Sequence, residues 1–361
     1  MNSQLTPAAV VIDRGVAEAP FTRSLLSRLP KNIPVTIRED GSPTPKGKRT
    51  LFITREQGSF LKKCPCSPGV VECGYYVFTL GFQCPFACSY CFLRFYAPDE
   101  PLTLYANLED AALEFRAAAK GWKRRIRVGT GEFTDSLALD HLTQHSAYLS
   151  ELVRPLPNVL MEVKTKSGNV EALLAADPPK NLIAAWSVNP PSFMANDEGG
   201  TATLDERLRA AGRYAEAGRK VAFHFDPVVM VEGWREKYLA VIAGIFDAVK
   251  PEAVAWISVG TLRFPKRFIE EWGAKLSGNP LFFDEFVPSP DGKLRYFWPR
   301  RREIYRFFAS GIKELGGKEV PLYLCMESNE MYSSAFGWPV SEGDVENFLT
   351  GMARGPLLPY D

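Results

Sequence analysis

Six of the seven cysteines of this 361-residue chain lie between Cys64 and Cys91, and only Cys325 stands apart. Within that stretch Cys84, Cys88 and Cys91 form a C-x₃-C-x₂-C pattern. Three thiolates at this spacing can bind three irons of a 4Fe-4S cubane and leave the fourth iron open to a cofactor or substrate. A structural zinc site would need a fourth protein ligand, so the spacing favours a cluster over zinc and over unliganded thiols. An odd number of cysteines without a secretory signal argues against a disulfide framework.

The overall composition is that of an ordinary globular protein. It has 46% hydrophobic and 24% charged residues, with 43 Lys and Arg against 42 Asp and Glu, a net charge of +1. A nucleic acid would therefore have to be bound by a local basic patch and not by the overall charge. The first seven residues carry no basic region followed by an apolar one, and nowhere do 18 apolar residues run together. We expect a cytoplasmic protein with no membrane partner.

From residue 75 onward, short β-rich runs alternate with helical patterns, which predicts a parallel sheet with crossover helices. The expected strands are 75–80, 126–129, 159–163, 183–187, 221–226 and 254–259. Six such units predict a partial (β/α)₆ TIM-like barrel, in which loops at the carboxyl ends of the strands carry the chemistry. We expect three parts, namely a small N-terminal α/β segment (1–74), the barrel (75–260) and a C-terminal hairpin and helix extension (261–361).

The cysteine triplet after the first expected barrel strand, with Tyr90 before its last cysteine, resembles the radical S-adenosylmethionine (radical SAM) superfamily. Over nearly its whole length the chain is similar to spore photoproduct lyase and its relatives within that superfamily. The shared stretches are 61–65, 73–75, 132–143, 165–166, 186–189, 227–238 and 295–298. The triplet indicates the superfamily, and the longer set indicates the lyase-like family.

This resemblance implies a 4Fe-4S cluster on Cys84, Cys88 and Cys91 that binds S-adenosylmethionine through its open iron. Reductive cleavage would then give a 5′-deoxyadenosyl radical that abstracts hydrogen from the substrate. The resemblance also implies a lyase acting on a nucleic-acid base or pyrimidine lesion in DNA repair or modification. Its electron would come from a donor such as flavodoxin or ferredoxin.

The resemblance assigns further residues to the cofactor. Lys166 matches the lysine that pairs with the methionyl carboxylate, and Ser187 matches a polar contact at a strand end. Tyr90 is the aromatic residue of the cluster motif and is expected in the cofactor site. Asp226 replaces a small apolar residue that lies near the cofactor in the lyases, which places a carboxylate there.

Two positions depart from the lyases. Glu132 stands where they have the cysteine that donates hydrogen to the substrate radical, and Phe92 stands where they have a relay tyrosine. Neither side chain has an S–H or O–H bond to give up. The stretch ending at Glu132 also resembles a glycine-rich motif whose acid binds the cofactor ammonium, the role that we prefer over a solvated glutamate. Asp135 either orients this loop or caps the following helix.

Other cysteines leave alternatives open. Cys325 is either an alternative hydrogen donor or, as is more common, a core cysteine. Cys64, Cys66 and Cys73 either bind a second metal or, more commonly, serve as small buried hydrophobic residues.

The stretch 295–302 interleaves arginines with aromatic residues and resembles a lyase hairpin that lies beside the lesion. Cations for phosphates and flat rings for stacking suit a nucleic acid, so Arg295, Tyr296 and Trp298 are the expected substrate contacts. A similar stretch at 120–127 is better explained as a solvated helix end. The competing functions are a radical enzyme on another substrate and a non-catalytic zinc-holding protein that binds nucleic acid.

Overall fold

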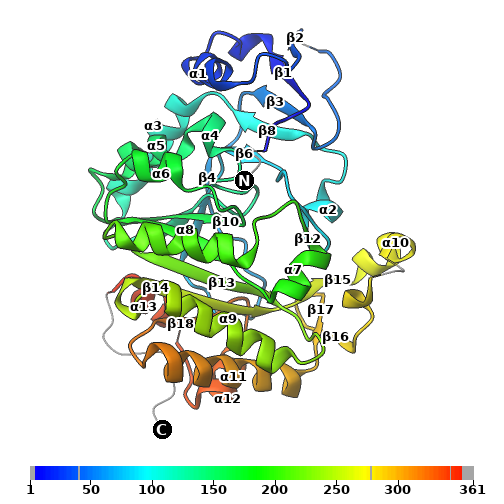
Figure 1. Ribbon diagram of the computed structural model, residues 1–361, viewed down its shortest axis with the longest axis vertical. Coiled ribbons are helices and arrows are strands. Elements are labelled where there is room, and N and C mark those ends of the chain that lie inside the picture. The colour runs from blue at the N-terminus through cyan, green and yellow to red at the C-terminus, as the bar shows by residue number, and fades with distance from the viewer. Residues whose placement is uncertain (1–4, 40, 277–278, 342, 352–361) are drawn as a thin grey trace. The chain divides into compact units, whose positions relative to one another are not determined.

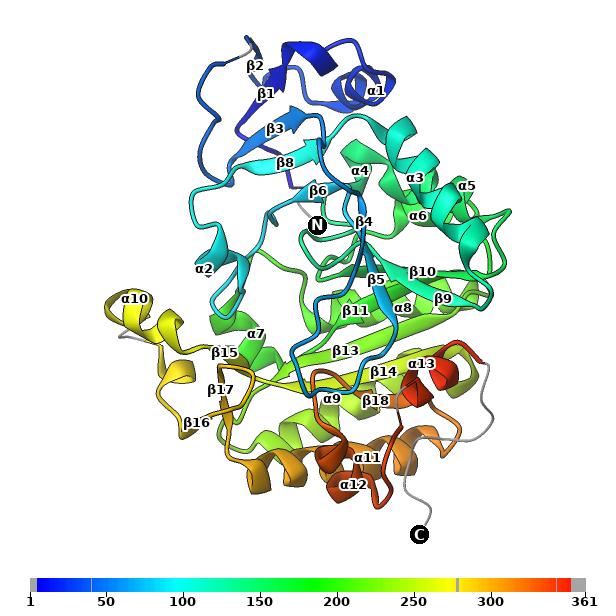
Figure 2. The same ribbon diagram turned by 180° about the vertical axis from the view of Figure 1, so that it is seen from behind.

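The computed structural model describes residues 5–39, 41–276, 279–341 and 343–351. The extreme ends of the expected N- and C-terminal parts lie outside these ranges. The chain divides into two compact units, each built from separate stretches (Figures 1 and 2). The first unit takes residues up to 64, 75–184 and 197–206, and the second takes 65–74, 185–196 and 207 onward.

A five-stranded sheet in the order β2-β1-β3-β8-β6 opens the first unit. Its strands are β1 (Ala9–Asp13), β2 (Val35–Arg38), β3 (Thr50–Thr54), β6 (Gly81–Phe82) and β8 (Leu102–Tyr105), and helix α1 (Pro20–Arg28) joins β1 to β2. All neighbours are parallel except β6, which runs antiparallel to β8.

The first unit also contains the opening strands of the barrel. Strands β5 (Tyr75–Phe78), β9 (Ile126–Gly129) and β10 (Val159–Thr165) are parallel, and β4 (Leu61–Lys63) lies antiparallel on β5. The helices that follow these strands are α3 (Leu108–Gly121), α4 (Asp140–Thr143), α5 (His145–Val153) and α6 (Glu171–Ala175). The register sets Val128 beside both Tyr76 and Met161. Because the strands are parallel, their carboxyl ends, including the loop after β9, lie along one edge of the sheet.

The second unit holds the parallel strands β13 (Val221–Val228), β14 (Val254–Thr261) and β18 (Leu322–Leu324). Its helices are α9 (Trp234–Ala248), α11 (Trp298–Gly316), α12 (Asn329–Phe336) and α13 (Asp344–Leu349). Helix α11 packs against both α9 and α12, as Figure 1 shows. Strand β11 (Leu182–Ser187) and helix α8 (Leu204–Glu216) each span a boundary between the two units.

The strand order of the larger sheet is β18-β14-β13-β11-β10-β9-β5-β4. The six strands expected from the sequence are therefore consecutive in it, and the prediction of a partial β/α barrel is confirmed. Strand β11 is buried at all six positions, which is typical of a parallel strand covered on both faces. The strand β18 beyond β14 extends the predicted set by one.

A small antiparallel sheet follows in the second unit. It consists of β15 (Arg263–Pro265), β17 (Lys293–Tyr296) and β16 (Phe286–Pro288), with helix α10 (Lys266–Leu276) after β15. Phe264 is its centre, with the rings of Phe282 and Phe286 5.3 and 4.9 Å away. This sheet, called the hairpin sheet below, contains Arg295 and Tyr296 in its middle strand.

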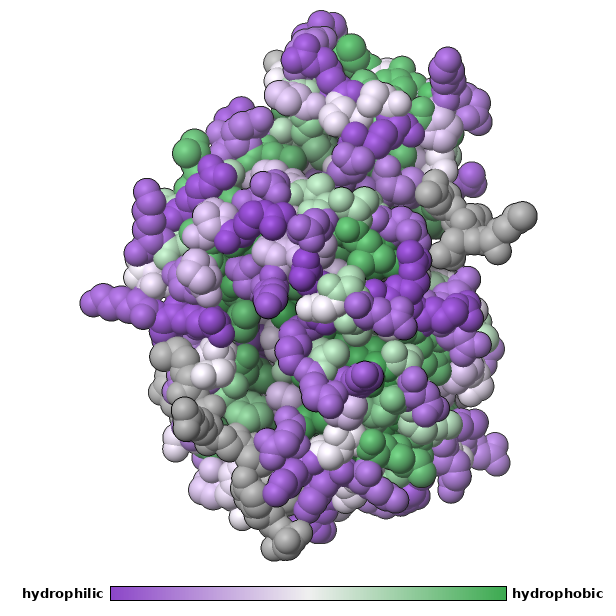
Figure 3. Space-filling view, turned by 60° about the vertical axis from the view of Figure 1, so that its left-hand side comes forward, coloured by the Kyte–Doolittle hydropathy of each residue, from purple (hydrophilic) through white to green (hydrophobic). Residues whose placement is uncertain are grey.

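None of the helices in the described residues is long and apolar enough to cross a bilayer. Figure 3 shows hydrophilic residues interspersed with smaller hydrophobic groups on one face of the molecule.

Candidate active site

The three predicted cluster ligands follow strand β6 in a loop, called the cluster loop below (residues 83–91). Cys88 is buried with Phe86 and Ala138 in one hydrophobic cluster, and Cys84 and Cys91 pack against the same cluster. The backbone N–H of Cys91 donates to the carbonyl of Cys88 at 3.4 Å. The three thiols of the C-x₃-C-x₂-C pattern are therefore seated on one apolar surface.

The environment of Cys84 shows how these thiols influence one another. Burial raises the pKa of the Cys84 thiol well above its usual range, and the Asp135 carboxylate raises it further. The charges of Cys91 and Cys88 act in the same direction. Thiolates gathered in this way need a positive partner, and a bound iron centre supplies that charge and deprotonates its thiol ligands.

Among the residues that the structure describes, no three His, Cys, Asp or Glu side chains are grouped as ligands of a single metal ion. The fit of the cluster loop to an iron–sulfur cluster therefore rests on the shared seat and the chemistry of its three thiols. Cys64, Cys66 and Cys73 are not joined in disulfides; Cys64 belongs to the first unit and the other two belong to the second.

The cluster loop is held by a segment more than a hundred residues away, called the clasp below (residues 197–202). Strand β7 (Ala87–Cys88) pairs antiparallel with β12 (Glu198–Gly199). The backbone N–H of Ser89 donates to the Asp197 carbonyl at 2.8 Å, and its hydroxyl donates to Oδ1 of Asp197 at 2.5 Å. The Tyr90 hydroxyl donates to Oε1 of Glu198. The clasp has no sequence signature, because two adjacent acids near a helix form no recognisable motif.

Asp135 organises the loop after β9. Its Oδ1 accepts from the backbone N–H groups of Leu137 and Ala138 at 3.1 and 2.9 Å, and from the Thr165 hydroxyl at 2.6 Å. Its Oδ2 accepts from the backbone N–H of Lys166 at 2.7 Å. Asp135 thus fixes the loop and the end of β10. The N–H groups of Leu137 and Ala138 that it binds precede helix α4, so its carboxylate does not cap that helix.

Glu132 and Lys166 lie at the carboxyl ends of neighbouring strands. Lys164 forms an ion pair with Glu132, and both side chains are partly exposed. A Cβ atom at Gly131 would lie 2.6 Å from the Cβ of Lys164, so glycine allows this close approach. The Lys166 ammonium lies 5.7 Å from the centre of the Tyr90 ring, within range of a cation–π interaction. Glu132 therefore already has an ammonium partner within the chain.

Phe92, at the position of the relay tyrosine, belongs to an aromatic group beside the last cluster cysteine. Its ring lies 6.1 Å from Tyr96 and 6.2 Å from Phe133, and Phe133 in turn lies 6.2 Å from Phe82. Phe92 and Tyr96 are 41% and 55% exposed. This part of the first unit offers flat apolar surface and no donor at position 92.

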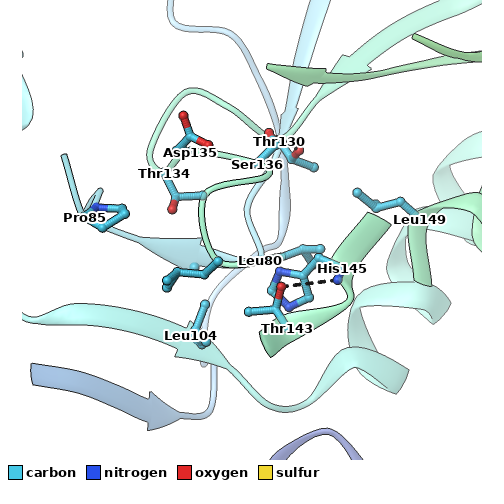
Figure 4. Close-up of a pocket in the computed structure, with 12 residues that line it drawn as sticks. Leu80, Pro85, Leu104, Thr130, Thr134, Asp135, Ser136, Thr143, His145 and Leu149 are labelled. Atoms are coloured by element: carbon cyan, nitrogen blue, oxygen red, sulfur yellow. Dashed lines mark hydrogen bonds between the residues drawn. The ribbon is translucent and has the colours of Figure 1, made fainter. Parts of the chain in front are cut away.

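A small cavity lies beside the loop that follows β9 (Figure 4). Thr134, Asp135 and Ser136 line one side, and Thr143 and His145 line the other, joined by a bond from the His145 N–H to the Thr143 hydroxyl. The cavity of about 20 Å³ has room for roughly one water molecule. It is too small for an adenosyl cofactor, so the loop around it is a packed support.

In the second unit, Ser187 ends strand β11 and is 5% exposed. Its carbonyl accepts from Nη1 of Arg207 at 2.8 Å. This bond fixes the backbone at the position where a polar cofactor contact is predicted.

Asp226, Arg263 and Cys325 meet at the carboxyl ends of β13, β14 and β18. Arg263 grips Asp226 with two bonds of 2.9 and 3.1 Å, and its Nη2 lies 3.7 Å from the sulfur of Cys325. Burial raises the pKa of the Cys325 thiol well above its usual range, and the Asp226 charge adds to the rise. Burial alone would lower the pKa of Arg263, but Asp226 raises it above its ordinary value. Cys325 is therefore a protonated thiol beside a closed ion pair.

Two of the three predicted substrate contacts, Arg295 and Tyr296, are buried and bonded within the second unit. Arg295 is 3% exposed, and its guanidinium donates to Oδ2 of Asp291 at 2.5 Å and to the Met326 carbonyl at 2.8 Å. Tyr296 is 1% exposed, and its hydroxyl accepts from the Met230 N–H at 3.1 Å. Trp298 opens helix α11 and packs under the Arg302 guanidinium at 5.4 Å. Arg295 and Tyr296 thus stabilise the interior of the second unit.

The family model for spore photoproduct lyase matches residues 61–270, which is more than half of the chain. The chain is 27% identical to spore photoproduct lyase of Bacillus subtilis over 267 residues, covering 70% of this chain and 77% of that protein. It is 29% identical to the lyase of a Geobacillus species over 168 residues, which cover 45% of this chain and 48% of that protein.

Solved structures of spore photoproduct lyase have the same fold. A variant with bound dinucleoside spore photoproduct superimposes with a TM-score of 0.78 at 20% identity, covering 90% of this chain and all of that one. A second variant, with bound S-adenosylmethionine and the same dinucleoside, gives 0.75 over 89% of this chain and 99% of that one. From the extent of the family match, this chain belongs to the spore photoproduct lyase family of radical SAM enzymes.

Proposed function

We propose that this protein is a radical SAM lyase that acts on a pyrimidine lesion in DNA. The observation that carries the proposal is the seat of Cys84, Cys88 and Cys91 on one apolar cluster. Its relatives are named spore photoproduct lyases, and solved relatives bind S-adenosylmethionine and the dinucleoside photoproduct. A low-potential protein such as flavodoxin or ferredoxin is the proposed electron donor.

The residues of the first unit suit these groups. Cys84, Cys88 and Cys91 would hold a 4Fe-4S cluster, and Lys166 would pair with the methionyl carboxylate. Glu132 would share its carboxylate between Lys164 and the cofactor ammonium. With S-adenosylmethionine bound, a reduced cluster of this kind supplies a 5′-deoxyadenosyl radical that abstracts a hydrogen atom.

Each unit carries aromatic residues that are proposed to contact the substrate. In the first unit, Phe92, Tyr96 and Phe133 present ring faces on which an unstacked base can pack. In the second unit, Trp298 and the 52%-exposed Phe297 stand at the start of α11. Arg295 serves these contacts indirectly, because it holds the hairpin sheet together.

The substrate radical must receive a hydrogen atom at the end of the reaction, and neither Glu132 nor Phe92 can give one. We assign this step to Cys325. Its S–H bond breaks as a C–H bond forms on the product, which is downhill because an S–H bond is weaker than a C–H bond. The raised pKa keeps the proton on sulfur. One electron from the low-potential donor and one proton from solvent then restore the thiol.

The first experiment measures 5′-deoxyadenosine formed by the anaerobically reconstituted protein with reductant and S-adenosylmethionine. We expect formation that increases with UV-irradiated DNA and disappears in Cys88→Ala. Formation that does not respond to DNA would point to a different substrate. A protein that carries its cluster and forms none would contradict the catalytic function.

The donor assignment is tested in D₂O, where thiol hydrogens exchange for deuterium. We expect one solvent deuterium in each repaired product, with its loss in Cys325→Ala while 5′-deoxyadenosine formation continues. Cys66→Ala, in the same unit, is the matched control. Deuterium retained in Cys325→Ala would assign the step to another group.

A further inference from the structure

The two residues between the second and third cluster cysteines, Ser89 and Tyr90, are both bound by the clasp. Asp197 takes two hydrogen bonds from Ser89, and Glu198 takes one from Tyr90. The pairing of β12 with β7 sets Glu198 directly opposite Cys88. Adjacent acids of the clasp therefore hold adjacent residues of the cluster motif.

Glu198 is an unusual residue for this place, because it is 3% exposed. A carboxylate loses much hydration energy on burial and needs strong hydrogen bonds in return. The Tyr90 hydroxyl provides one, and a hydrogen bond to an ionised acceptor is stronger than a neutral one. The Thr201 hydroxyl donates to the Glu198 carbonyl at 2.8 Å and stiffens the clasp behind it.

The clasp also reaches the predicted cofactor lysine. The Ala202 N–H donates to the Lys166 carbonyl at 3.0 Å, which ties the clasp to the end of β10. The Lys166 ammonium lies over the ring whose hydroxyl Glu198 binds. The Tyr90 ring is therefore located between an ammonium at its face and a carboxylate at its hydroxyl.

We propose that Glu198 is a positioning residue for S-adenosylmethionine, acting through Tyr90 and the Lys166 that packs on it. The inference rests on the proposed function. Glu198 fixes the rotamer of Tyr90, and the fixed ring holds the Lys166 ammonium where a carboxylate can meet it. Without the bond to Glu198, the Tyr90 and Lys166 side chains would sample other positions. Ordering them again when the cofactor binds would cost binding free energy.

The test compares Glu198→Ala, Glu198→Gln and Tyr90→Phe, each with a reconstituted cluster. The measurements are iron per chain, the Kd of S-adenosylmethionine, and the EPR spectrum of the reduced cluster as the cofactor is added. We expect Glu198→Ala to raise the Kd about tenfold, with iron content and the spectrum of the cluster alone unchanged. Glu198→Gln keeps an acceptor for the Tyr90 hydroxyl and should recover part of the loss. It also serves as the test variant if Glu198→Ala does not fold.

The matched control is Glu206→Gln. Glu206 lies eight residues further on, where it accepts from the Thr203 N–H at 2.9 Å in a capping box. Its hydrogen bonds with Thr203 close the first turn of its own helix, so the Kd of S-adenosylmethionine in Glu206→Gln should equal that of the unsubstituted protein. An equal Kd in Glu198→Ala would overturn the positioning role.

A double variant shows whether Glu198 acts through Tyr90. If it does, Glu198→Ala adds nothing to the Kd of Tyr90→Phe, because the hydroxyl is already gone. Additive losses would refute action through the tyrosine. An unsubstituted protein that carries its cluster yet binds no S-adenosylmethionine would refute the proposed function itself, whereas equal affinities in a protein that binds it refute the positioning role alone.

Discussion

The cluster loop and the hairpin sheet were both singled out by their residue types, and the structure uses those residues in opposite ways. In the cluster loop the neighbours of the cysteines are held by the clasp, while the three thiols share an apolar seat. In the hairpin sheet, the predicted substrate contact Arg295 is itself buried and hydrogen-bonded to Asp291 and Met326. The same kind of sequence signal therefore marks a candidate site in one region and a structural contact in the other.

The largest expected effect is in the cluster loop. Cys88→Ala should lose the cluster and all 5′-deoxyadenosine formation, because two thiolates cannot hold three corners of a cubane. Iron content and the visible absorption of the anaerobic protein measure the loss. Cys66→Ala should keep both, and equal iron in the two variants would remove the distinction between the two groups of cysteines.

Breaking the internal pair of the hairpin sheet comes next. Arg295→Met should lower the free energy of unfolding by about 3–5 kcal/mol, because the buried Asp291 carboxylate loses its arginine and keeps the longer ion pair with Lys293 at 3.8 Å. Urea unfolding measures this change. Adding Asp291→Leu should recover much of the loss, since removing both charges avoids the poorly paired carboxylate. A loss below about 1 kcal/mol would mean that Arg295 is available for the surface role that its sequence context suggests.

The two regions should also differ in the sign of their response to pH. Burial raises the pKa of Asp140, in α4 beside the loop after β9, to about 6, against the opposing bonds from Ser146. Because the pKa is higher in the folded protein, folding is favoured while the Asp140 carboxyl is protonated. This contribution to stability is fully present at a pH below the ordinary pKa of aspartate and is lost as the pH rises through 6. Burial alone would also raise the pKa of Asp291, but the hydrogen bond and charge of Arg295 outweigh it, so the pKa is lowered. Its stabilisation is present above the ordinary value and is lost as the solution becomes more acidic.

Asp140→Asn isolates the first effect. Its free energy of unfolding relative to the unsubstituted protein should rise by about 2 kcal/mol between pH 4 and pH 7, since each pKa unit is worth about 1.4 kcal/mol and part of the shift already applies at pH 4. Neighbouring His145, whose pKa burial and Arg28 lower to about 4, has the opposite slope, which cancels in this difference. Asp291→Asn should add no slope in this window. A flat difference for Asp140→Asn would show that the carboxyl is solvated in the folded protein.

The smallest effect is expected at Trp298, the one predicted hairpin contact outside the deep interior. Trp298→Ala should weaken binding to a single-stranded or lesion-containing oligonucleotide by about fivefold, because stacking contributes roughly 1–3 kcal/mol per base. Fluorescence anisotropy measures the change at a stated salt concentration. Arg302→Met, which removes only the cation above the ring, is the control and should change binding less. Unchanged affinity in Trp298→Ala would remove the last of the sequence-predicted hairpin contacts.

Local patterns in the sequence were enough to predict the class of fold and to nominate the cluster ligands. Alternation of apolar strands with capped helices depends on local periodicity, which is why the six predicted barrel strands lie consecutively in the sheet. The cysteine triplet is equally local, since its eight-residue span indicates which thiols can share a cluster. The capping box at Thr203 and Glu206 also follows a local spacing, and both of its reciprocal bonds are present.

The partners of the polar residues, in contrast, follow from the tertiary structure and could not be predicted from the sequence. The contact of Tyr90 with Glu198, the pair of Glu132 with Lys164, and the grip of Arg263 on Asp226 beside Cys325 each join residues from different elements. Such contacts depend on strand register and chain crossing, which leave no pattern in a single sequence. The burial of Arg295 also depends on such distant contacts. The sequence pattern of a basic residue between aromatic residues is the same whether the side chain faces water or a carboxylate. Local spacing therefore fixed where the chemistry can occur, and the packing of distant segments fixed which side chains are available for it.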